Sequence, residues 1–109
     1  MEHGKILYRY TVSNGKFFIH EGVVNDCGTR LLVNFKDGGA ALRCPRKEDL
    51  GTIRSVGHSL WMDHRDDSFA RREFIYYESK KIVGLQKLID RKVKTIEMLM
   101  ELEEKEWSI

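Results

Sequence analysis

The chain has 109 residues, of which 41% are hydrophobic and 33% charged, and its formal net charge is +2. This length suits one domain with a modest core, and no apolar run approaches the roughly 20 residues that a membrane span needs. The net charge is too small to indicate a polyanion partner by itself, and the first residues lack the layout of a signal peptide. We therefore expect one cytoplasmic domain over residues 1–109, with no membrane partner.

Residues 1–62 are predicted to form an antiparallel β-meander, as a curled sheet or a small open barrel. The side chains of residues 5–12 alternate with period two, which is typical of a strand with one buried face. Asn14-Gly15 predicts a hairpin, because both residues tolerate positive φ. Further strands, interrupted by turns, are predicted over residues 17–24, 29–36, 40–44 and 56–62. In the strand over residues 29–36, Leu31 or Leu32 is expected to face the core.

Residues 66–107 are predicted to be helical, which makes the fold class α+β. The segment contains no proline, and its only glycine is Gly84. A single glycine weakens a helix without ending it, so the helix is either continuous or broken near Gly84 or Arg91. The domain thus divides into a β-meander over 1–62 and a helical segment over 66–107.

The sequence His64-Arg65-Asp66-Asp67 joins the two halves. It resembles the start of the protein-kinase catalytic loop, but Arg71 stands where that loop has asparagine, and there is no D-F-G motif. An aspartate before a helix accepts hydrogen bonds from the free N–H groups of the first turn. We therefore interpret Asp66 or Asp67 as a helix cap rather than a catalytic carboxylate.

An apolar stripe runs along one face of the predicted helix. Its positions from Ile82 are separated by 3, 4, 4, 3, 4 and 7 residues, a pattern that repeats every eleven residues. An eleven-residue repeat corresponds to about 3.67 residues per turn and keeps the stripe nearly straight. The stripe consists of Ile82, Leu85, Ile89, Val93, Ile96, Met100 and Trp107.

The predicted helix is much longer than the predicted sheet. About 40 helical residues span roughly 60 Å, whereas five-residue strands make a sheet about 17–20 Å long. The sheet cannot cover the stripe, so either a broken helix folds back on itself or the stripe packs on another chain. We favour a homodimer formed through the stripe. Because the terminal glutamates oppose the helix dipole, fraying is the alternative for Met100 and Trp107.

Nucleic-acid binding is the main alternative function. Aromatic and cationic side chains on a small β-fold can stack on bases and contact phosphates. Lysines on a helix can also contact phosphates. The same residues are also typical of a sheet core and a solvated helix face. The candidate nucleic-acid contacts are Arg9, Arg43, Arg46, Lys47, Lys80, Lys87 and Arg91.

No motif predicts an active site or a cofactor. The chain has no P-loop, dinucleotide fingerprint or G-x-S-x-G sequence. Cys27, Cys44 and the histidines lack the spacing of a metal site. Residues 37–39, Asp-Gly-Gly, form a weak phosphate-cradle candidate and a better turn. We expect a non-enzymatic protein without catalytic residues, metal or cofactor.

The segment VGHSLWMDHRDDSFARREFIYYESKKI combines an aromatic strand, Arg-Asp-Asp, Ala-Arg-Arg-x-Phe and a Lys/Glu-rich helix. From Val56 to about Leu102 the chain resembles small proteins encoded by bacterial phages and mobile elements, most of them without an assigned function. The resemblance brings no catalytic residues. It implies a protein that binds and inhibits a host macromolecule, as anti-CRISPR proteins do.

Overall fold

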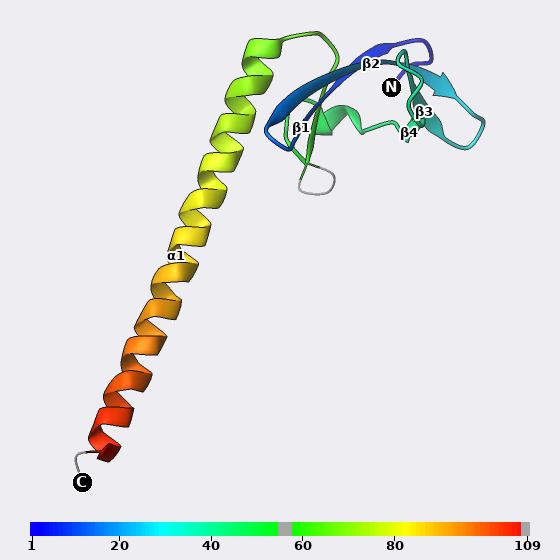
Figure 1. Ribbon diagram of the computed structural model, residues 1–109. Coiled ribbons are helices and arrows are strands. Elements are labelled where there is room, and N and C mark those ends of the chain that lie inside the picture. The colour runs from blue at the N-terminus through cyan, green and yellow to red at the C-terminus, as the bar shows by residue number, and fades with distance from the viewer. Residues whose placement is uncertain (55–57, 108–109) are drawn as a thin grey trace. The chain divides into compact units, whose positions relative to one another are not determined.

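The computed structural model describes residues 1–54 and 58–107, with Trp107 described by its backbone alone. It confirms the α+β prediction, because a curled antiparallel sheet is followed by one long helix (Figure 1). The chain divides into two compact units, which we call the β unit (Met1–Ile75) and the helical unit (Tyr76–Ile109). The strands are β1 (Ile6–Ser13), β2 (Lys16–Asp26), β3 (Leu31–Phe35), β4 (Leu42–Arg43) and β5 (Ser59–Met62). A 3-10 turn (Lys47–Asp49) lies between β4 and β5, and the helix is α1 (Asp67–Trp107).

The turns follow the predicted positions closely. Asn14 and Gly15 both have positive φ, 52° and 72°, and they join β1 to β2 as the predicted hairpin. The loop before β5 contains a single turn of 3-10 helix, Lys47–Asp49. The last predicted strand is observed as Ser59–Met62, and positions 56 and 57 lie outside the described residues.

The sheet order is β4-β3-β2-β1-β5. β1 to β4 form the predicted meander, and β5 then returns to pair with the free edge of β1. Gly22 lies in the middle of β2, where an added Cβ would collide with the side chain of Val33. The missing side chain therefore lets β3 residues close over this part of the sheet.

The prediction that β1 buries one face is wrong, because the sheet carries a core on each face. Leu7 and Tyr10 are both fully buried, although they point to opposite faces of β1. The first core consists of Tyr10, Leu60, Met62, Ala70 and Phe74. The second consists of Leu7, Val24, Val33 and Trp61, with Leu31 packed against it. The first turns of α1 cover one face of the sheet, and the loops cover part of the other, so an alternating strand is buried on both sides.

The junction between the sheet and α1 confirms the capping interpretation. The Phe69 amide donates a hydrogen bond to Asp66 Oδ1 at 3.0 Å, so Asp66 is the cap. The Tyr10 hydroxyl donates to Asp67 Oδ1 at 2.9 Å and accepts from the Asp66 amide at 3.0 Å. Burial, followed by the bond to Asp67, raises the pKa of Tyr10. One buried tyrosine thus fixes the start of the helix to β1.

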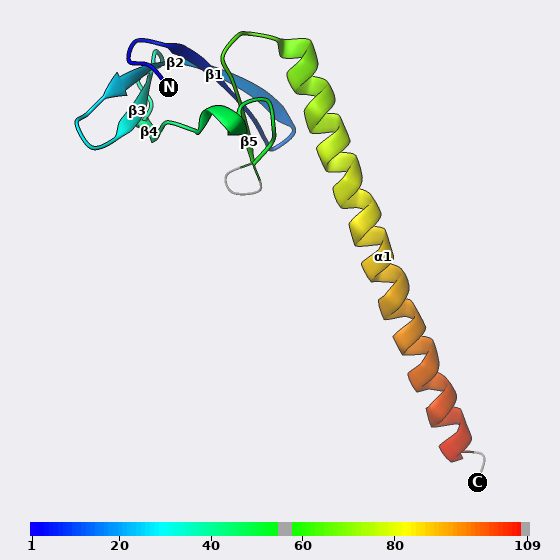
Figure 2. The ribbon, with the colours of Figure 1, turned by 180° about the vertical axis from the view of Figure 1, so that it is seen from behind.

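α1 is continuous from Asp67 to Trp107, so of the two alternatives left open by the sequence the unbroken helix is observed, and the break near Gly84 or Arg91 is not (Figure 2). A helical glycine costs only about 1 kcal/mol, which is less than the cost of ending a helix without caps. Thr95 donates a hydrogen bond to the Arg91 carbonyl at 3.0 Å, next to one of the two positions considered for a break. The alternative of two helices folded on each other is therefore excluded. No helix among residues 1–54 and 58–107 has the length and apolar character to cross a bilayer.

Candidate functional site

The helical unit exposes the predicted apolar stripe. Its described side chains are between 46% and 67% exposed, and α1 is the only element described in this unit. Nothing lies within 4 Å of a Cβ built at Gly84. The stripe consists of Ile82, Leu85, Ile89, Val93, Ile96 and Met100, while the side chain of Trp107 lies outside the described residues.

An exposed row of this kind is unusual on a monomer. Burying a large aliphatic side chain contributes about 1.5–3 kcal/mol, and helices gain most of their stability by packing an apolar face. The stripe is therefore a candidate interaction surface.

Charge is segregated along the same helix. Residues 76–94 carry six Lys/Arg and two Asp/Glu, a net charge of +4. Residues 95–107 carry one Lys and five Glu, a net charge of −4. One helix therefore contains two oppositely charged halves of equal magnitude.

The face of the sheet that carries the second core contains a second candidate site around Arg9. Arg9 lies between His20 of β2 and Trp61 of β5 in the strand register. Its guanidinium carbon is 5.9 Å from the centre of the Trp61 ring, a cation–π distance. Its Nε is buried and has no hydrogen-bond partner among the described residues. Burial lowers the pKa of Arg9, because it disfavours the charged form.

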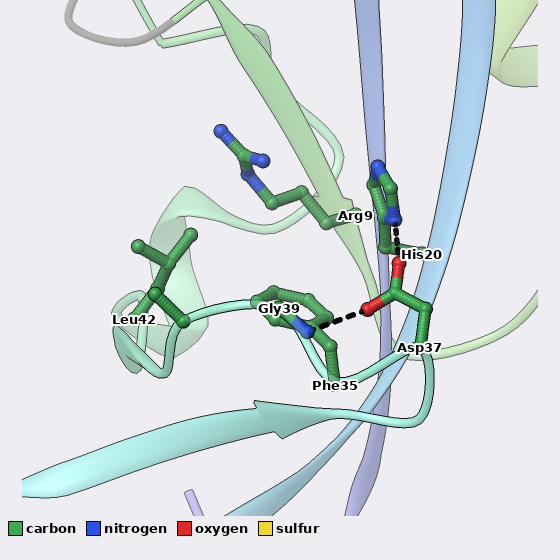
Figure 3. Close-up of a pocket in the computed structure, with 7 residues that line it drawn as sticks. Arg9, His20, Phe35, Asp37, Gly39 and Leu42 are labelled. Carbon is green, nitrogen blue, oxygen red and sulfur yellow. Dashed lines mark hydrogen bonds and ion pairs between the residues drawn. The ribbon is translucent and has the colours of Figure 1, made fainter.

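A hollow of about 230 Å³ opens beside Arg9 (Figure 3). On one side, His20 Nδ1 lies 2.6 Å from Asp37 Oδ2, and the Gly39 amide donates to Asp37 Oδ1 at 3.1 Å. Both contacts lower the pKa of Asp37, and the hydrogen bond from Gly39 has the larger effect. The residues around this space, which we call the Arg9 hollow, are Arg9, His20, Phe35, Asp37, Gly39, Ala40 and Leu42.

Several aromatic side chains contact one another on this face of the sheet. The His20 ring stacks on Phe18, with centroids 6.4 Å apart, and meets Phe35 edge-on at 6.0 Å. Phe35 in turn lies 5.9 Å from Trp61. Two of these rings, His20 and Phe35, line the Arg9 hollow, and they offer contacts to flat, apolar groups.

A third feature, the basic hollow, has a volume of about 330 Å³ and lies near β4. It brings together three predicted nucleic-acid contacts, Arg43, Arg46 and Lys47, and adds Arg30, which the sequence analysis missed. Arg9 lines the other hollow instead. The remaining predicted contacts, Lys80, Lys87 and Arg91, belong to the helical unit, where at about 100° per residue they face away from the stripe.

The other chemical candidates have structural roles. Among residues 1–54 and 58–107, no group of three or more His, Cys, Asp or Glu side chains is placed to hold a metal ion. Arg65 pairs with Asp67 at 3.1 Å, and this contact lowers the pKa of Asp67. Burial raises the pKa of Cys44, which reduces its reactivity.

The sheet, the helix and these surfaces define an α+β protein with candidate interaction sites. No family model, curated protein or solved structure matches this chain.

Proposed function

We propose that this protein is a non-enzymatic interaction module that self-associates through the stripe of α1. The observation that carries the proposal is the exposure of six large apolar side chains along one face of a continuous helix. In water this surface favours association, because contact removes apolar area from solvent. Its eleven-residue spacing offers a straight seam to a partner helix.

A second copy of the chain is the partner that the charges of α1 favour. Two antiparallel helices set the +4 half of each against the −4 half of the other, whereas parallel helices in register align like charges. Charges within about 10 Å interact at moderate salt. Electrostatic complementarity of this kind selects partners and orientation more than it adds affinity.

A dimer would give the protein two copies of its β unit. Each copy carries an Arg9 hollow and a basic hollow, so a ligand with two binding sites gains avidity without new contacts. The phage-protein resemblance adds a target class, a host macromolecule, and an inhibitory role to this proposal.

Light scattering on purified protein tests the self-association. We expect a mass of twice 12.8 kDa for the wild type and a monomer for Ile96→Glu, because the charge would lie within the dimer seam. The matched control is Met98→Glu, which replaces another half-exposed apolar residue away from the stripe and should remain a dimer. A monomeric wild type, or dissociation by both variants, would contradict the proposal.

Nucleic-acid binding is a second candidate, favoured by the clustering of Arg30, Arg43, Arg46 and Lys47 around one hollow. Phosphate contacts by these side chains predict affinity that falls steeply between about 50 and 200 mM salt. Fluorescence anisotropy with mixed-sequence single-stranded DNA and RNA measures this. Arg43→Gln combined with Arg46→Gln should remove binding, while no binding by the wild type at low salt would exclude this candidate.

A further inference from the structure

Arg9 differs from the paired cations of the β unit. Lys5, Lys36 and Arg65 each pair with a carboxylate, of Asp63, Glu21 and Asp67 respectively. Arg9 lies on a central strand and is half-buried, yet it makes no ion pair with any described residue.

The buried Nε of this guanidinium has no hydrogen-bond partner among the described residues, which is energetically costly. Burial removes water from the cation, and an unmade hydrogen bond leaves the desolvation cost uncompensated. The Trp61 ring offsets part of this cost. Arginine presents five N–H donors in a fixed planar arrangement that matches a carboxylate or a phosphate, so an oxyanion is the group that would complete the site.

Asp37, the acid that lines the hollow, is not the anionic partner of Arg9. Asp37 uses one carboxylate oxygen for His20 and the other for the Gly39 amide. Figure 3 shows the Arg9 guanidinium directed away from Asp37, on the other side of the hollow. The opening next to the guanidinium is bordered by Phe35 and Leu42, which provide apolar surface.

We propose that the Arg9 hollow binds an oxyanion, a carboxylate or a phosphate, that is attached to a flat apolar or aromatic group. The anion pairs with Arg9, and the flat group lies against Phe35 and Leu42. The volume of about 230 Å³ is below that of typical drug-sized sites, about 300–1,000 Å³. A single ring with its acidic group therefore fits better than an extended ligand. The site lies within the β unit and is independent of self-association through α1.

Benzoate and phenyl phosphate are suitable probes, and benzamide is the neutral control of nearly the same shape as benzoate. Titration of isotope-labelled full-length protein, followed by NMR, should shift the amide signals of His20 and Gly39 with either anion. Benzamide should bind at least tenfold more weakly. The stronger of the two anions identifies the acid class, carboxylate or phosphate, that the site prefers.

Arg9→Met should weaken binding of both anions at least tenfold, while Arg43→Met, which removes a cation from the basic hollow, should leave it unchanged. If Arg9→Met fails to fold, Ala40→Glu replaces it, because Ala40 is exposed and a carboxylate there would compete for Arg9. Equal binding of benzamide, unchanged binding by the folded Arg9 variant or by Ala40→Glu, or no binding of either anion would overturn the proposal.

Discussion

The β unit and the helical unit use their apolar residues in opposite ways. In the β unit, Tyr10, Leu7 and Leu60 are fully buried between elements that lie far apart in the sequence. In the helical unit, Leu85 and Ile96 are more than half exposed, because a single helix has no second element to pack on.

This difference separates two sources of stability. The β unit owes its stability to contacts within one chain, so its unfolding should not depend on protein concentration. The helical unit, on our proposal, is stabilised by a second copy, and its melting temperature should rise with concentration. Circular dichroism at 222 nm across a range of concentrations compares the two directly. If the melting temperature of the helix signal does not change with protein concentration, a second copy does not stabilise the helical unit, which would contradict the proposal.

The largest effect within this comparison is expected for Leu60→Ala. Leu60 is fully buried in the first core, and such truncations cost about 2–5 kcal/mol because they leave a cavity. Urea denaturation followed by Trp61 fluorescence, in a Trp107→Phe background, measures this loss. Ile89→Ala on the stripe should leave the Trp61 transition unchanged. If the two substitutions lower the stability measured in that transition equally, the β unit and the helical unit are not stabilised separately.

The elements of the fold were largely predictable from the sequence, because their signals are local. Asn14-Gly15 predicts the hairpin from backbone freedom alone, and Asp66 predicts the start of α1 from its cap. The pairing of β5 with β1 could not be read in this way, since it depends on contacts between residues about 50 positions apart. For the same reason, the second core was missed.

The stripe and the Arg9 hollow differ in the same respect. The stripe is a periodic pattern along one helix, so its residues could be listed from the sequence. The Arg9 hollow combines residues of β1, β2, β3, β4 and the segment between β3 and β4, and only the register brings Arg9 beside His20. Asp37 lies in a turn, as the sequence predicts, yet its carboxylate also contacts His20, which no local pattern indicates.

A smaller loss is expected when the hydroxyl of Tyr10 is removed. Tyr10→Phe keeps the ring in the first core but leaves the Asp66 amide without its acceptor and removes one of the donors to Asp67, which keeps the bonds from Arg65. Deleting a hydrogen-bonded group of this kind costs about 1–3 kcal/mol. Urea denaturation followed by Trp61 fluorescence in the Trp107→Phe background should show this loss. Tyr76→Phe, at an exposed ring of α1, is the control, and a Tyr10 variant as stable as wild type would show that the junction does not stabilise the β unit.

The smallest effect concerns pH and Asp67. The hydrogen bond from Arg65 holds the pKa of Asp67 below its ordinary value, with a further contribution from Tyr10. A carboxyl group whose folded-state pKa is lowered stabilises the fold above its unfolded pKa, about 3.9, and this stabilisation is lost as the pH falls through the folded value. Asp67→Asn should therefore be less stable than wild type at neutral pH, and the difference should close in acid. Urea titrations at several pH values measure it, and a difference that stays constant down to acid would show that the charge of Asp67 has no part in fixing α1 to the sheet.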